Sequence, residues 1–574
     1  MATGPAAPRA PARVRLLPIL FGVSAALTAL ILATILRPGY LLYRDAVSTP
    51  RSFVTDSALG LGDIPARAVP QDWLVAITSR VVDGGALVTA ILFLGLTLAG
   101  VGYGRLAARL VPAAGRSGAV AATVASIWNP YVAERLLQGH WSLLVSYAAL
   151  GWIAVAAIQA GAGARRGWCA LVAAVALAGF TPTGSVLAAI LLAVSLIPAL
   201  VRTRRWGGLA MTAAIWLVGA APWLTATAVG SAPATAGSSG FEVFGIRAEP
   251  GLGTVGTALG LGGIWNSDAV PASRTIWWAA VATIAFLVVV AAGTAWWWRH
   301  RQMLDKSIGP LGALTLATVA AVCVAAVPAV AAGLSTLAHD VPGVGLFRDT
   351  QKYLALTMPF VAVAAAAAVA GLRRWVPAGF ALGVTALLVV APLPDLAWGV
   401  GGKLSTVHYP PDWTAVAGII PADAGAVAVW PPGTVRRYPF ADTVSLNPLP
   451  RMVRATVVDS GRLTVDGVAV DPGAGRGAEV DAALRRGGRA ADLAALGVGW
   501  VVVENGLPPR ELASTSTAVY RGADLTLYRI PGPIAAFGAS AGARAAVIAA
   551  HVAWGLATVG GLGGVWWSRH RRRR

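Results

Sequence analysis

Long apolar runs alternate with short basic turns along most of this chain. Twelve of these runs approach the length that an α-helix needs to cross a bilayer, about 20 residues. They predict membrane-spanning helices near residues 16–36, 85–104, 117–130, 141–160, 167–181, 185–201, 207–226, 276–298, 310–332, 354–372, 376–393 and 543–567. The pattern therefore predicts an all-α polytopic membrane protein.

One long segment, residues 394–542, departs from this pattern because it is far less apolar. Residues 425–430, 498–503 and 524–528 are typical of strands, and the Ala- and Leu-rich stretch 478–496 is typical of a helix. We expect three regions. Residues 1–393 form a transmembrane core with a long loop at 37–84, residues 394–542 form a small α/β domain, and residues 543–574 form a last helix with a basic tail.

The composition supports membrane insertion and excludes several other classes of protein. Of 574 residues, 56% are hydrophobic and only 12% are charged, and the mean hydropathy is +0.68. A soluble domain has about 25% charged residues, so a soluble enzyme and a disordered chain are both excluded. The two cysteines, Cys169 and Cys323, lie in apolar runs, which excludes a disulfide framework.

The net charge of +20 is distributed as membrane orientation requires, and not as a nucleic-acid-binding patch. The turns on the side of the N-terminus carry 21 basic residues and a single acid, Asp305. Short basic loops stay in the cytoplasm, so we expect both termini to be cytoplasmic in a plasma-membrane protein. The loops 37–84, 227–275 and 333–353 and the domain 394–542 are then extracytoplasmic.

This asymmetry limits the chemistry that the protein can perform. The expected cytoplasmic turns are short, and the sequence contains no G-x-x-x-x-G-K-[ST] phosphate loop, which argues against an ATP-driven pump. Nucleotide sugars are absent from the outer side of a cell membrane. A transferase acting there would therefore need a lipid-linked donor that has already crossed the bilayer.

Asp45 is the strongest candidate for a catalytic group. It lies just past the first predicted span, where a carboxylate could act on a lipid head group as a general base. Arg44 beside it could keep it ionised or bind a phosphate. The alternative is a solvated loop carboxylate paired with Arg44. Three other acids of the same loop could take the role of Asp45; they are Asp56, Asp63 and Asp72.

Two further stretches place ionisable groups near the same expected boundary. Glu134, Arg135 and His140 interrupt an apolar region, and such groups near membrane depth usually face a cavity or a partner. They could bind a substrate or form a structural ion pair. Arg348 and Lys352 are four residues apart, so on a helix they would share one face and suit a lipid phosphate. The alternative is a charged flank of the next span.

A glycine-rich loop near residues 245–266 ends in Trp265 and Asn266, which could contact a sugar. A lone glycine-rich loop is a weak signal, and an ordinary surface loop is the alternative. The six histidines are not at metal-ligand spacing, so we expect no protein-only metal site and no cofactor. A divalent cation held between Asp45 and a phosphate is left open.

The order of these features resembles the GT-C class of integral-membrane glycosyltransferases. The resemblance rests on Tyr43-Arg44-Asp45 after the first span, on Asn129-Pro130…Glu134-Arg135-Leu136…Gly139-His140-Trp141, and on Phe347-Arg348-Asp349…Lys352. It is greatest for actinobacterial mannosyl- and arabinofuranosyltransferases that use polyprenyl-phosphate sugars in cell-envelope assembly.

That resemblance implies a membrane enzyme that moves a sugar with inversion from polyprenyl phosphate to an envelope glycan or glycolipid. It implies Asp45 as the base, and Arg348, Lys352 and Arg44 at the donor phosphate. Two other functions stay open at this point. One is a transporter or lipid flippase, although the spans carry almost no charge. The other is a non-catalytic scaffold of envelope assembly.

Overall fold

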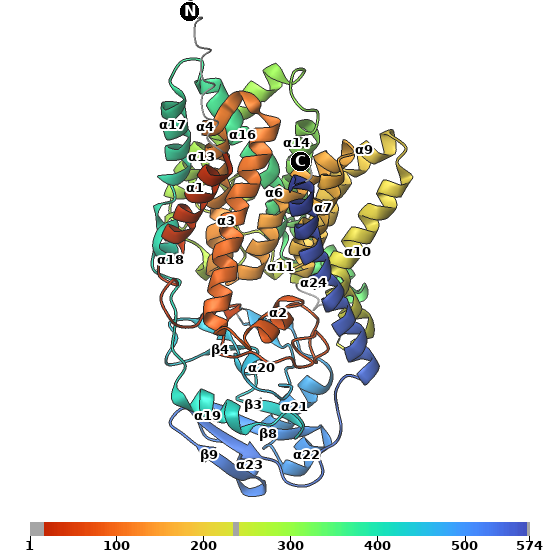
Figure 1. Cartoon of the computed structure of the whole chain (residues 1–574). Helices are drawn as coiled ribbons and strands as arrows, with labels where there is room; N and C mark the ends of the chain where they lie inside the picture. Colours follow the sequence, from red (N-terminus) through yellow and green to blue (C-terminus); the bar gives the residue numbers. More distant parts are fainter. Residues whose placement is uncertain (1–15, 233–239, 466, 505, 571–574) are drawn as a thin grey trace, which may run out of the picture.

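The computed structural model describes residues 16–232, 240–465, 467–504 and 506–570. The basic residues Arg9, Arg13 and Arg15 and the tail 571–574 lie outside this part of the chain. A tall bundle of helices forms one end of the molecule, and a mixed α/β domain forms the other, with helix α2 (Gln71–Thr78) between them (Figure 1). The protein is therefore mostly helical, as the apolar pattern predicts.

The bundle is built from apolar helices of very different lengths. They are α1 (Leu16–Ile31), α3 (Gly84–Leu110), α4 (Gly115–Ile127), α6 (Trp141–Gly161), α7 (Arg165–Ala178), α8 (Pro182–Ser195), α9 (Ile197–Arg202), α10 (Trp206–Val229), α13 (Trp278–His300), α14 (Ile308–Ala325), α15 (Pro328–Asp340), α16 (Met358–Leu372), α17 (Ala378–Val390) and α24 (Ala541–His570).

The prediction of twelve spans is not confirmed. Within the described residues, eight helices are long and apolar enough to cross a membrane, or nine if α17 and the segment Pro394–Gly401, bent by 76°, form one span. The remaining three predicted spans correspond to α1, α4 and α7, which have 16, 13 and 14 residues. At 1.5 Å per residue, such helices are roughly 20–24 Å long, which is short of the ~30 Å hydrocarbon core.

Two helix breaks follow directly from the sequence. Asn129 and Thr181 each precede a proline, which fits the first position of a helix because its missing N–H would be unpaired there anyway. The Asn129 side chain accepts a hydrogen bond from the N–H of Val132 at 3.0 Å and so begins α5 (Pro130–Leu137). Thr181 begins α8 in the same way.

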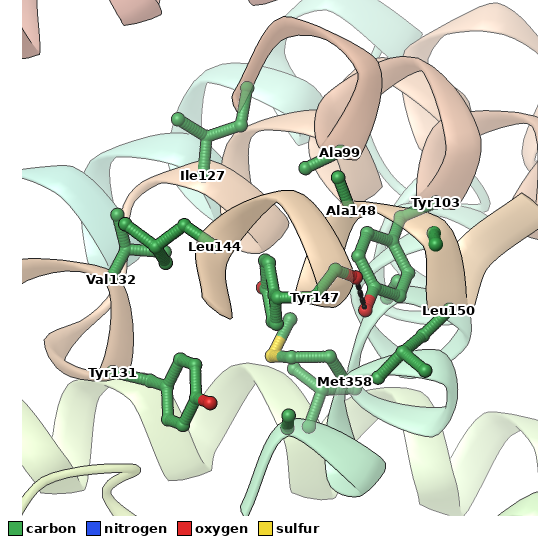
Figure 2. Close-up of a cluster of buried hydrophobic side chains, with 14 of the residues drawn as sticks. Ala99, Tyr103, Ile127, Tyr131, Val132, Leu144, Tyr147, Ala148, Leu150 and Met358 are labelled. Atoms are coloured by element: carbon green, nitrogen blue, oxygen red, sulfur yellow. Dashed lines mark hydrogen bonds between the residues drawn. The ribbon is translucent and has the colours of Figure 1, made fainter. Parts of the chain in front are cut away.

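The centre of the bundle contains a cluster of tyrosines that come from α3, α5 and α6. Tyr103 of α3 donates a hydrogen bond to the main-chain oxygen of Tyr147 at 3.0 Å, and the rings of Tyr131 and Tyr147 stack with centroids 5.4 Å apart (Figure 2). The Tyr131 hydroxyl donates to the main-chain oxygen of Lys352 at 3.0 Å. This fully buried core thus joins α5 to the 3-10 segment η5 (Thr350–Thr357).

The mixed domain has a four-stranded sheet in the order β3-β8-β10-β9. β3 (Ala426–Trp430) and β8 (Val498–Glu504) are parallel, whereas β8, β10 (Leu525–Arg529) and β9 (Thr517–Arg521) are antiparallel. The three expected strands are therefore present. The expected single helix 478–496 is two helices, α21 (Gly475–Arg485) and α22 (Ala490–Ala495), separated at Gly487 and Gly488.

The smaller elements of this region complete the connection to the bundle. They are α18 (Ala397–Gly401), α19 (Pro411–Ile419), β4 (Val435–Arg437), β5 (Val444–Leu446), α20 (Leu449–Met452), β6 (Leu463–Val465), β7 (Val468–Asp471) and α23 (Arg510–Thr515). Near the start of the chain, β1 (Leu42–Tyr43) and β2 (Ala46–Val47) form a minimal hairpin. Short helices α11 (Gly240–Val243) and α12 (Gly253–Leu259) lie in the loop before α13.

Candidate functional site

Asp45 lies at the tip of the hairpin β1–β2 and is held there by the main chain. Arg44 has a left-handed backbone, with φ of 50°, so the hairpin turns sharply. The N–H of Arg44 donates to Val444 at 2.8 Å, and its carbonyl accepts from Leu446 at 2.9 Å, so the turn pairs with β5. On the other side, the N–H of Asp45 donates to the main-chain oxygen of Gln138 at 3.2 Å.

The Asp45 carboxylate is oriented by two side chains from the α5–α6 connection. His140 Nε2 lies 2.9 Å from Asp45 Oδ2, and Gln138 Nε2 donates to the same oxygen at 3.4 Å. The Asp45 side chain is 40% exposed, which leaves it accessible. Burial alone would raise the pKa of Asp45, but the hydrogen bonds from His140 and Gln138 and the charge of Lys352 outweigh it and lower the pKa.

The protonation of His140 follows from its second neighbour. Its Nδ1 lies 3.0 Å from Nη1 of Arg135, and a guanidinium can only donate. Nδ1 must therefore accept, and the ring is neutral with its proton on Nε2, directed at Asp45. Burial and the positive charges of Lys352 and Arg135 lower the pKa of His140, despite the opposing effect of Asp45. Arg135 thus fixes the tautomer that holds Asp45.

Arg135 is itself fixed by two residues that come from the opposite side of the bundle. Its guanidinium binds Asp349 with two hydrogen bonds, of 2.8 and 3.2 Å, and also donates to the side-chain oxygen of Gln351. Burial would raise the pKa of Asp349, but the charges of Arg135 and Lys352 hold it well below its usual range. A bidentate arginine–carboxylate pair gives the geometry little freedom.

Glu134 belongs to the same network. Its two carboxylate oxygens accept hydrogen bonds from the N–H groups of Gly263 and Ile264, each at 3.0 Å, and from Gln351 at 3.0 Å. Glu134 and Arg135 are fully buried, so they contact neighbouring groups of the protein and not the open side of the site. Through these contacts, Glu134 positions the glycine-rich loop and Arg135 positions His140.

The two predicted cations lie on the same side of the bundle as Asp45. Lys352 Nζ is 3.5 Å from Asp349 Oδ2, and its charge reaches Asp45. Arg348 Nη1 binds both oxygens of Asp471, each at 3.0 Å, and its guanidinium lies over the Phe244 ring at 4.5 Å. Asp471, at the end of β7, also binds Arg67 at 3.5 Å. The mixed domain therefore contributes an acid between two loop arginines.

The structure separates Asp45 from the other three acids of its loop. Each of those acids pairs with an arginine from the C-terminal part of the chain: Asp56 with Arg544 at 2.7 Å, Asp63 with Arg476 at 3.2 Å and Asp72 with Arg451 at 3.1 Å. They tie the loop to the mixed domain and to α24. Asp45 differs because its partners are a neutral histidine and an amide.

The remaining candidate residues lie at the edge of this network. The Asn266 side chain donates to Gln138 at 2.8 Å and so orients the amide that contacts Asp45. Trp265 packs edge-on against Phe244, with ring centroids 4.7 Å apart, and Arg348 lies over the same Phe244 ring. The Arg44 guanidinium donates to the main-chain oxygens of Leu137 and Asp268, at 2.5 and 3.0 Å, and so joins three segments.

Sequence reasoning did not assign five residues that belong to this network: Arg67, Gln138, Asp349, Gln351 and Asp471. Arg67 and Asp471 carry no local signal, because their partners are hundreds of residues away in the chain. Gln138 and Gln351 lie inside the motifs that drew attention to Glu134 and Arg348, but neutral amides gave no reason to select them.

Among the described residues, no group of three or more His, Cys, Asp or Glu side chains could hold a metal ion.

Comparison with known proteins gives little further information. No protein-family model matches the chain, and no curated protein matches it. Among solved structures, the chain is similar to a mutant of the arabinofuranosyltransferase AftD from Mycobacteria, with a TM-score of 0.46 and 17% sequence identity. The similar region covers 89% of this chain and 41% of that chain, so this chain spans less than half of the AftD length.

Proposed function

We propose that this protein is a membrane glycosyltransferase that moves a sugar from a polyprenyl-phosphate donor to a hydroxyl of an envelope glycan or glycolipid. The observation that carries the proposal is an accessible carboxylate, Asp45, oriented by His140 and facing the charge of Lys352 beside the ends of membrane-spanning helices. Mannose or arabinofuranose is the expected sugar, on the GT-C resemblance of the sequence.

The reaction needs a base on one side of the anomeric carbon and cations on the other. Asp45 takes the proton of the acceptor hydroxyl, the hydroxyl oxygen bonds to the anomeric carbon, and the bond from that carbon to the phosphate oxygen breaks. The bonding electrons leave on the phosphate, and the configuration inverts. General-base assistance of this kind contributes about 10²–10⁴-fold in rate.

The basic side chains of the site suit a phosphodiester donor. The network contains four basic side chains, Arg67, Arg135, Arg348 and Lys352, among its carboxylates. Arg348 and Arg67, now bound to Asp471, are the cations that a phosphate would contact in competition with that acid.

The first prediction is that Asp45→Asn strongly lowers the rate of sugar transfer while the protein still inserts and folds. The amide keeps the shape but cannot accept the proton, so we expect kcat to fall by about 10²-fold or more. Transfer of radiolabelled sugar from a polyprenyl-phosphate donor in membranes measures this. The matched control is Asp423→Asn at an exposed position of the mixed domain. Unchanged transfer in Asp45→Asn would remove Asp45 from the mechanism.

A second substitution tests the phosphate contact separately from the base. Arg348→Ala should raise the donor KM and leave the acceptor KM near its original value, because the lost charge binds the donor. An unaltered donor KM would show that the donor phosphate does not contact Arg348, even if Asp45 is the base.

A further inference from the structure

A second group of arginines surrounds Phe53, apart from those at Asp45. The guanidinium carbon of Arg51 lies 5.1 Å from the centre of the Phe53 ring, and that of Arg454 lies 5.3 Å from it. Arg80 is close enough for its positive charge to act on Arg51. Two cations from distant parts of the chain thus lie over one aromatic ring, and Arg80 lies near one of them.

Hydrogen bonds between these segments build the group. The Ser79 hydroxyl accepts from the N–H of Ser52 at 3.0 Å and donates to the Ser52 carbonyl at 3.3 Å. These two hydrogen bonds hold the main chain of Ser52 next to Arg80. The N–H of Phe53 donates to the carbonyl of Arg451 at 3.2 Å, which brings the segment after α20 against the same loop. The three arginines are therefore held together by the fold itself.

In the part of the chain that the structure describes, no ion pair joins Arg51, Arg80 or Arg454 to an acid. Nη1 of Arg51 is buried and has no hydrogen-bond partner among the described residues. Burial and the charges of Arg80 and Arg454 lower the pKa of Arg51. The two acids of this region are already engaged, Asp72 with Arg451 and Asp83 with the N–H groups that begin α3. A buried N–H group without an acceptor is costly unless an anion joins it.

The group lies where a membrane lipid could supply that anion. Arg80 immediately precedes Val81 and Val82, whose side chains are 89% and 44% exposed, and the spanning helix α3 begins at Gly84. Apolar side chains exposed at the end of a spanning helix are expected to lie at the bilayer boundary. Phe53 also lines a cleft beside this group, whose wall includes Ser52 and Arg451.

We infer that Arg51, Arg80 and Arg454 bind the phosphate of an anionic membrane lipid at the end of α3. Guanidinium groups suit this ligand because they donate several hydrogen bonds in a planar geometry that matches phosphate oxygens. The site is separate from the one proposed for catalysis, and it does not depend on the sugar-transfer reaction.

The test uses the full-length protein in neutral detergent and measures lipid binding by native mass spectrometry. The probes are dioctanoyl phosphatidylglycerol, dioctanoyl phosphatidylcholine and inorganic phosphate. The wild-type protein should prefer phosphatidylglycerol, and Arg51→Gln/Arg454→Gln should bind it about tenfold or more weakly. The matched control, Arg485→Gln/Arg486→Gln, removes two exposed arginines of the mixed domain and should bind like the wild type.

Each contrary outcome has a definite meaning. Equal binding of the two lipids, unchanged binding in Arg51→Gln/Arg454→Gln, or equal loss in the control would overturn the site. Competition by inorganic phosphate at the same concentration as the lipid would overturn a lipid as the source of the anion. Arg51→Lys/Arg454→Lys keeps both charges and should retain most of the binding, which separates loss of charge from loss of folding.

Discussion

The state of His140 decides how Asp45 is held, because one ring nitrogen faces a donor-only guanidinium and the other faces the carboxylate. The residues themselves were evident from the sequence. The series of contacts from Arg135 through His140 to Asp45 was not evident, because it depends on packing between α5 and a hairpin about 90 residues earlier. Ionisable residues at an apolar boundary can be noticed in a sequence, but their pairing requires the fold.

His140 gives a prediction for stability against pH. Its pKa in the folded protein lies below the usual 6.5, so the unfolded chain binds this proton first as the pH falls. Stability should therefore decrease below about pH 6.5 and decrease less in His140→Gln, which cannot take up a proton. The midpoint of thermal unfolding in detergent, measured between pH 7.5 and 5, provides the comparison. Parallel curves for the two proteins would contradict a neutral His140 in the folded state.

At the scale of elements, local signals explain where two helices begin, and one of these, α5, was not predicted. Asn129-Pro130 and Thr181-Pro182 begin helices because a capping side chain and a proline satisfy local requirements. The predicted segment 16–36 extends past the end of α1 at Ile31, whereas 117–130 and 167–181 agree with the lengths of α4 and α7 to within one residue.

The contact between the hairpin β1–β2 and the α5–α6 turn gives a prediction for Gly139. Its φ is +82°, and a Cβ added there would lie 2.3 Å from the N atom of Ala46 and 2.9 Å from that of Asp45. Gly139→Ala should therefore displace Asp45 and lower sugar transfer nearly as much as Asp45→Asn, although no chemical group is removed. The control is Gly418→Ala, at an exposed position of α19 with no atom near the added methyl. Normal transfer by Gly139→Ala would mean that the hairpin position is not critical.

For the whole molecule, the basic pattern of the turns predicts the orientation in the membrane. The turn after α13, with Arg301, should be cytoplasmic, and the mixed domain, with Asp423, should lie on the opposite side. Arg301→Cys and Asp423→Cys, each in a background without Cys169 and Cys323, can be labelled in intact cells with a membrane-impermeant maleimide. Only Asp423→Cys should react. Labelling of Arg301→Cys alone would reverse the orientation, and with it the side on which the site acts.

The pairing of the Asp45 turn with β5 has a consequence for biosynthesis. The strand that receives the turn, Val444–Leu446, is translated about 400 residues after Asp45. A nascent chain can insert most of its helices and still lack the surface against which this carboxylate is set. Polypeptides that end before residue 444 should therefore lack activity. Activity should arise only after the mixed domain has been translated and has folded against the hairpin β1–β2.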